Sequence, residues 1–225
     1  MNTPLEAAPL VAVATAAAPG RLQAWLQLAG ARHALVLGGF SLAATLLLAL
    51  AHTLTREPIA ERALDDLRYS LAQVIPAAIH DNNPASDSFE LPQPGGPLRV
   101  YRARRAGRVT GVAFETHGRG YSSDIRVLLG VAADGRLLGV RVLQHAETPG
   151  LGDKIEAARS DWITRFTGLR LGDPPEPMWA VKKDGGRFDQ FAGATITPRA
   201  VVASVRNGLR LFAAQRKTLL EESAP

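Results

Sequence analysis

The stretch IRVLLGVAADGRLLGVRVL, residues 125–143, carries the clearest structural signal in this chain. Apolar residues alternate with others through its first half, as in a β-strand that buries one face. These alternating residues are Ile125, Val127, Leu129 and Val131. Asp134-Gly135 is a dipeptide typical of tight hairpin turns, and a second apolar segment follows it at 137–143. The stretch therefore predicts an antiparallel β-hairpin.

The segments on either side of this hairpin indicate the fold class. Two further strands are expected at 98–105 and 109–115, and a short one around 179–182. Apolar residues recur at helical spacing in 150–168 and in 198–220. A chain with antiparallel hairpins and helices that pack on them belongs to the α+β class.

A long apolar run precedes the predicted sheet. Ala34 to Ala51 is an unbroken run of 18 uncharged residues, and as a helix it spans about 27 Å, close to the hydrocarbon thickness of a bilayer. A cleaved signal peptide has a short basic leader, whereas 33 residues precede this run. A core helix of a soluble protein usually shows polar residues on one side. A transmembrane anchor is therefore the favoured interpretation among the three, and the flanking charges leave its orientation open.

The expected organisation has five parts. They are a mobile N-terminal tail (1–32), a transmembrane helix (33–52), a helix and loop that lead into the soluble domain (53–97), one folded domain (98–215) and a C-terminal tail (216–225).

Composition excludes several functional classes. The chain has no cysteine, so disulfides, thiolate metal sites and iron–sulfur clusters are ruled out. No glycine-rich phosphate loop with a following lysine and no cluster with metal-ligand spacing occurs. The net charge is +5, but the arginines are spread along the chain without a block of five like charges, which favours solvated side chains over a nucleic-acid surface.

The segment DQFAGATITP, residues 189–198, contains two threonines in different settings. Proline favours the first helical position, so Thr197 is expected to be the N-cap of a helix that begins at Pro198. Thr195 then lies just outside that helix, close to a terminus whose free N–H groups and dipole favour a phosphate. From these residues alone, an ordinary loop leading into a capped helix is the simpler interpretation.

Asp189 and Gly193-Ala194-Thr195 resemble the Asp-x-x-Ser/Thr-Gly-Ala-Thr motif of the FMN-binding domain family. Ala192 stands where that motif usually has Ser or Thr. The resemblance implies FMN bound covalently as a phosphoester on Thr195. It also implies a separate flavin transferase that takes FMN from FAD and recognises Asp189.

A second block strengthens this resemblance. Glu147 to Gly152 is similar to the Glu-Thr-Pro-Gly-Leu-Gly loop of the same family, and Trp179 to Gly186 lies in the matching order between the two motifs. Together they look like the RnfG (RsxG) family of the Rnf ion-translocating oxidoreductases, over residues 33–215, and less closely like the C subunit of the sodium-pumping NADH:quinone reductase. The flavin contacts that this resemblance implies, besides Thr195, are Glu147, Thr148, Leu151, Gly152, Gly193 and Ala194.

The resemblance also implies a function. The chain would be a single-pass subunit of an inner-membrane translocase, with its soluble domain on the periplasmic side. Its FMN would relay electrons in a ferredoxin/NAD-type reaction coupled to Na⁺ or H⁺ movement. Implied partners are the other Rnf subunits, above all the membrane D subunit, together with the flavin transferase and lipid. No residue is expected to act as a catalytic acid or base or to bind metal. The alternative is a non-redox, membrane-anchored scaffold or binding module of the same fold.

Overall fold

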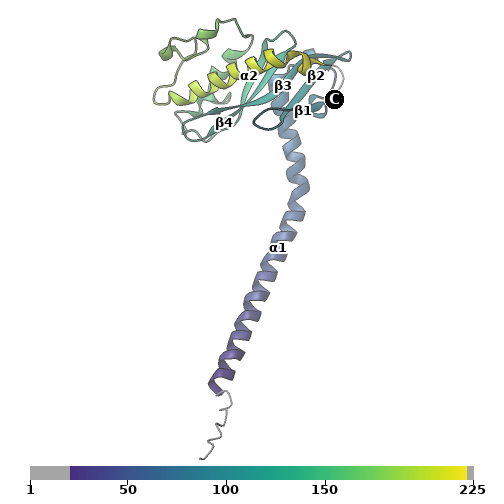
Figure 1. Ribbon diagram of the computed structural model, residues 1–225, viewed down its shortest axis with the longest axis vertical. Helices are drawn as coiled ribbons and strands as arrows, with labels where there is room; N and C mark the ends of the chain where they lie inside the picture. Colours follow the sequence, from purple (N-terminus) through teal and green to yellow (C-terminus); the bar gives the residue numbers. More distant parts are fainter. Residues whose placement is uncertain (1–20, 222–225) are drawn as a thin grey trace, which may run out of the picture. The chain divides into compact units, whose positions relative to one another are not determined.

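The computed structural model describes residues 21–221, with only the backbone helix described for 21–29. The first twenty residues of the predicted tail therefore lie outside the described residues, as do 222–225. Helix α1 (Arg21–Val74) begins inside the segment predicted as a tail. The chain forms two units, Met1–Ile59 and Ala60–Pro225, and α1 runs through both (Figure 1).

The first unit contains the apolar part of α1. Between Gly30 and Val74 this helix is long and apolar enough to cross a membrane, with a mean hydropathy of 2.2 over its best 18 residues, none of which is buried. The Thr45 hydroxyl donates to the carbonyl of Ser41 at 2.8 Å, so this polar side chain is satisfied within its own helix. The predicted apolar helix is confirmed, and a hydroxyl inside it presents no barrier to insertion.

The second unit is built on one five-stranded sheet. The strands follow one another in space as they do in the chain, and each pairs antiparallel with the next. They are β1 (Ser88–Leu91), β2 (Leu98–Arg105), β3 (Arg108–Arg119), β4 (Asp124–Ala132) and β5 (Leu137–Gln144). The predicted hairpin is β4–β5, which turns at Gly135. The α+β prediction is confirmed.

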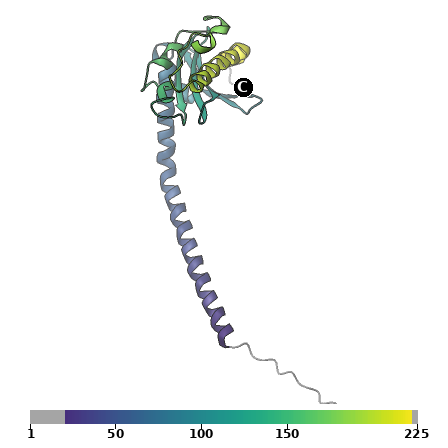
Figure 2. The same cartoon turned by 90° about the vertical axis from the view of Figure 1, so that its left-hand side faces the viewer.

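Helix α2 (Ile196–Leu220) covers one face of this sheet (Figure 2). Its apolar side chains, among them Val205 and Leu209, join Phe114 and Leu129 of the sheet in the main hydrophobic core. Since α2 continues to Leu220, it includes the start of the segment predicted as a C-terminal tail.

The C-terminal end of α1, which belongs to the same unit, packs on the opposite face. Leu71 and Val74 form a second, smaller core with sheet residues such as Leu128. Gly130 of β4 makes this approach possible, because a Cβ added there would lie 2.0 Å from the Val74 carbonyl oxygen. The sheet is thus enclosed between two helices.

We expect Gly130→Ala to destabilise the second unit by about 1–3 kcal/mol or more, because the new methyl group must displace helix backbone. Urea unfolding of the detergent-solubilised chain, followed by tryptophan fluorescence, measures this loss. Gly95→Ala is the matched control, since a Cβ at Gly95 meets nothing within 4 Å. Equal unfolding midpoints for the two variants would contradict the close packing described here.

The segment between β5 and α2 differs from the sequence-based prediction. The helix expected over 150–168 is wrong: the structure has two short 3₁₀ helices there, because the backbone becomes extended at Glu156 and interrupts the segment in its middle. The short strand expected around 179–182 is reduced to one bridge, between Val181 and Phe188. The loop expected over 81–97 contains β1. The 3₁₀ helices of the second unit are Ala77–Ile79, Pro84–Ser86, Asp153–Ile155, Trp162–Phe166, Glu176–Met178 and Lys182–Asp184.

Candidate functional site

Three segments that are distant in sequence meet around one pocket at an end of the sheet. They are the loop before β4, the loop after β5 and the entry to α2. The pocket has a volume of about 460 Å³, within the range of small-molecule sites. Its lining residues are Tyr121, Glu147, Thr148, Leu151, Gly152, Gly193, Ala194, Thr195, Ile196 and Thr197.

The pocket brings together almost every site residue that the sequence resemblance indicated. Thr195 and all six implied contacts line it, whereas Asp189 does not. Sequence reasoning missed Tyr121, Ile196 and Thr197. Ile196 and Thr197 could have been predicted, because both lie in the segment 189–198 that contains Thr195. The position of Tyr121 depends on the fold of a distant loop.

The entry to α2 holds Thr195 at the pocket wall. A tight turn precedes it, in which the Ala194 amide donates to the Phe191 carbonyl at 3.2 Å and Gly193 adopts a φ of +80°. Thr195 occupies the N-cap position of α2, is half-buried and makes no capping hydrogen bond with its side chain. Its hydroxyl is therefore not used to cap the helix that it precedes.

The prediction that Thr197 is the N-cap is wrong. Helix α2 begins at Ile196, so Thr197 and Pro198 lie in its first turn. The Thr197 side chain is buried and its hydroxyl donates to the Glu147 carboxylate. This hydroxyl is therefore bound to a buried carboxylate of another loop, and Thr197 lies inside the helix instead of capping it.

Glu147 is a buried carboxylate surrounded by donors. Besides Thr197, it accepts from the Ser122 amide at 3.0 Å and from the Tyr121 amide at 3.3 Å. Burial disfavours the charged form, but these hydrogen bonds outweigh it and hold the pKa of Glu147 below its ordinary value. Glu147 therefore places a negative charge in the pocket wall at neutral pH.

This pKa shift makes the stability of the second unit depend on pH at the acid end. A carboxyl with a depressed folded-state pKa adds stability that is full above its unfolded pKa, about 4.3, and is lost as the pH falls through the folded value. We expect the unfolding free energy to fall more steeply below about pH 4 in the native chain than in Glu147→Gln, which cannot titrate there. Urea titrations at a series of pH values measure both slopes, and equal slopes would contradict the assignment.

Two glycines let the surrounding backbone approach this carboxylate. A Cβ added at Gly120 would lie 2.5 Å from Glu147 Oε1, and one added at Gly152 would lie 2.8 Å from the Glu147 Cβ. Any other residue at either position would push the loops apart. Glycine at both positions therefore leaves room for the Glu147 side chain between the two loops.

Asp189 lies outside the pocket lining and forms ion pairs at the protein surface. Its carboxylate pairs with Lys182 at 2.6 Å and with Arg165 at 2.5 Å. Both partners lower the pKa of Asp189, and Lys182 has the larger effect. Its backbone carbonyl accepts from the indole N–H of Trp162 at 2.8 Å. Trp162 and Trp179 are both buried in the core. Within residues 21–221, no group of three His, Asp or Glu side chains is placed to hold a metal ion.

Comparison with known proteins identifies the family. Residues 120–210 match the model of the FMN-binding domain, and residues 29–74 match that of the RnfG N-terminal region. The G subunit of the ion-translocating oxidoreductase complex of Cereibacter sphaeroides is 57% identical over 187 residues, which are 83% of this chain and 85% of that protein. This chain belongs to the RnfG family. The corresponding G subunit of Stutzerimonas stutzeri is 46% identical over 198 residues, 88% of this chain and 86% of its own.

A solved structure with partial similarity is that of Shewanella oneidensis NqrC. It has a TM-score of 0.46 and 23% identity, over 64% of this chain and 73% of that one. Membership of the RnfG family rests on the sequence matches. Together with the apolar part of α1, it makes the chain a membrane-anchored protein of an ion-translocating oxidoreductase complex.

The pocket of this RnfG-family chain has an apolar wall and a helix terminus, which are features that suit FMN. Leu151 and Ile196 expose apolar side chains, 42% and 45% accessible, that can contact a flavin ring. The first turn of the 25-residue helix α2 presents backbone N–H groups without helical partners, and the helix dipole favours a phosphate there. Apolar walls and an anion-binding terminus thus occur in one cavity.

Proposed function

We propose that this chain carries FMN as a phosphoester on Thr195 and relays electrons through it within its complex. The observation that carries this proposal is the placement of Thr195. Its side chain stands at the N-cap of α2, lines the pocket and makes no capping hydrogen bond. A hydroxyl at that place can be joined to a phosphate while the helix terminus stabilises the phosphate charge.

The attachment step is a phosphoryl transfer from FAD. The Thr195 oxygen forms a bond to the phosphorus of the FMN half, the phosphoanhydride bond to AMP breaks, and AMP leaves as the hydroxyl proton is released. A separate flavin transferase catalyses this step. Asp189, six residues before Thr195, is partly exposed between two basic side chains, and we assign it to recognition by the transferase.

Bound FMN supplies one- and two-electron transfer, and the pocket residues hold it in place. Leu151 and Ile196 form the apolar wall, and Thr148 contributes a hydroxyl at the rim. Gly193 and Ala194 leave room beside Thr195 because they carry little or no side chain. None of these residues needs to exchange a proton with the substrate, since the chain acts as a carrier.

Membership of the RnfG family supports an assignment of the location and the neighbouring subunit of this electron carrier. We assign the second unit to the periplasmic side of the inner membrane, next to the membrane D subunit, in a ferredoxin/NAD-type translocase. The chain has neither cysteines for an iron–sulfur cluster nor a dinucleotide fingerprint, and we assign to it the transfer of electrons between neighbouring subunits through FMN.

The proposal is tested by the intact mass of the full chain, co-expressed with its flavin transferase and purified in detergent. We expect a gain equal to FMN less one water, and a band that fluoresces after denaturing electrophoresis. A chain with the bare polypeptide mass under these conditions would overturn the proposal and favour a scaffold of the same fold.

A further inference from the structure

We infer that Glu147 and Thr197 form a positioning pair, in which a buried anionic carboxylate fastens the first turn of α2, and so Thr195, to the loop before β4. This inference rests on the proposed function, since it assigns the part of the pocket that places the attachment residue. Glu147 is thus a positioning residue, which acts on the flavin through the groups that it binds and through its charge.

The first support is the number of segments that meet at this one side chain. Glu147 stands in the loop after β5, Tyr121 and Ser122 stand in the loop before β4, and Thr197 stands in α2. All three segments line the pocket. Within the described residues, the Glu147 carboxylate is the side-chain group that hydrogen-bonds both of the other two segments.

The second support is the need for an anion at this position. Both carboxylate oxygens accept: Oε1 from the Ser122 amide, and Oε2 from the Tyr121 amide and the Thr197 hydroxyl. A glutamine of the same shape has one acceptor oxygen, and its NH₂ group would face a donor. Since Glu147 is only 5% exposed, water cannot easily repair that mismatch.

The third support is the fixed orientation of the loop that carries Glu147. The Glu147 amide donates to His145 Nδ1 at 3.1 Å, and the opposite ring nitrogen of His145 lies 2.7 Å from the Glu156 carboxylate. The Ala146 amide donates to the Ser123 hydroxyl at 2.9 Å, a second tie to the loop before β4. The carboxylate is therefore directed at its donors by its own backbone.

Two consequences follow for a bound flavin. Because α2 is held two residues after Thr195, the direction in which the attached phosphate leaves the helix is fixed. The negative charge in the pocket wall also opposes the gain of electrons by the flavin. Glu147 thus lowers the flavin midpoint potential in addition to placing the attachment residue.

The test compares Glu147→Gln with Glu90→Gln, which removes an exposed carboxylate that pairs with Arg99 and lies outside the pocket lining. Full chains co-expressed with the transferase are measured by intact mass and by redox titration. We expect Glu147→Gln to lower the FMN-bearing fraction roughly tenfold, the size of effect typical of one hydrogen bond to a charged group. We also expect a more positive midpoint potential in the fraction that does carry FMN. Glu90→Gln should change neither quantity.

Variants of Thr197 separate positioning from folding. Thr197→Ser keeps the hydroxyl and should retain the native FMN-bearing fraction. Thr197→Val should lower this fraction but leave the midpoint potential unchanged, because the Glu147 charge is still present. A native FMN fraction and a native potential in Glu147→Gln would overturn the inference.

One readout is independent of the cofactor. Amide hydrogen exchange at Tyr121, Ser122 and the first turn of α2 should accelerate in Glu147→Gln chains made without the transferase. Unchanged exchange would overturn the inference even if the native chain is flavinylated. Accelerated exchange, in a native chain that never gains FMN, would keep the positioning pair and reject only the proposed function.

Discussion

Thr195→Val is expected to abolish the covalent flavin completely. Valine has nearly the shape of threonine but no oxygen, so no phosphoester can form, while the turn before α2 is left intact because Thr195 makes no capping hydrogen bond. Intact mass of the chain co-expressed with its transferase should show the bare polypeptide, and the fluorescent band should disappear. The unfolding free energy should stay within about 0.5 kcal/mol of native, as for other substitutions away from the core.

Two controls make this result specific. Thr195→Ser keeps an oxygen at the same place and should retain some covalent FMN. Thr164→Val removes another hydroxyl, one that donates to the Asp161 carbonyl at 2.6 Å outside the pocket lining, and should leave the FMN content unchanged. Full FMN mass in Thr195→Val would mean that another residue carries the flavin.

The β-sheet was predictable because its signal is local. In 125–143 the alternation and the Asp134-Gly135 turn lie within one stretch of sequence, and the structure has this hairpin as β4–β5. The second helical layer was not predictable, because nothing local says that the end of α1 packs on Gly130. The segment 150–168 has apolar residues at helical spacing, and Ile155, Trp162 and Phe166 are buried, but the backbone becomes extended at Glu156 and forms two short 3₁₀ helices in place of one α-helix.

The pocket shows the same contrast between local and distant information. Thr195 could be singled out only by resemblance to a family motif, since the residues alone favoured an ordinary capped helix. The role of Thr197 was misjudged because its partner, Glu147, is 50 residues away in the chain. An N-cap preference is worth only about 1 kcal/mol, so a contact with a residue far along the chain can place the same threonine inside the helix.

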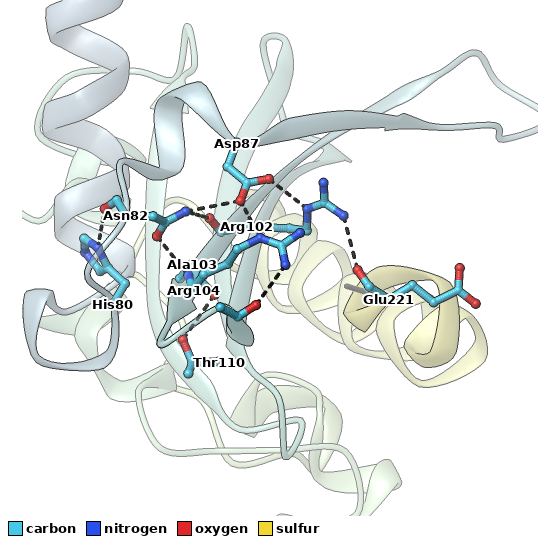
Figure 3. A network of polar contacts seen from close by, with 9 residues as sticks. His80, Asn82, Asp87, Arg102, Ala103, Arg104, Thr110 and Glu221 are labelled. Carbon is cyan, nitrogen blue, oxygen red and sulfur yellow. Dashed lines mark hydrogen bonds and ion pairs between the residues drawn. The ribbon is translucent and has the colours of Figure 1, made fainter. Parts of the chain in front are cut away.

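A buried ion-pair network joins the edge of the sheet to the end of α2 (Figure 3). The Arg102 side chain is 4% exposed, donates to Asp87 at 3.0 Å and to the Glu221 carbonyl at 3.2 Å, and lies 4.8 Å from the centre of the Phe89 ring. Asp87 also pairs with Arg104 at 2.6 Å. The Asp87 carboxylate therefore pairs with two guanidinium groups, and that of Arg102 is almost wholly buried.

Asp87→Ala is expected to destabilise the second unit by about 3 kcal/mol, because it leaves the buried Arg102 charge without a counter-ion. Urea unfolding of the full chain in detergent measures this loss. Asp124→Ala is the matched control: its pair with Arg119 is exposed, at 66% and 75%, and surface pairs of this kind contribute about 0–1 kcal/mol. If the cost comes mainly from the stranded Arg102 charge, adding Arg102→Met to Asp87→Ala should recover most of it, because Arg104, the other partner of Asp87, is less buried and keeps its bond to the Gly107 carbonyl at 3.2 Å. A double variant as unstable as Asp87→Ala alone would assign the loss to other contacts of Asp87, such as its bond from Asn82 at 3.3 Å.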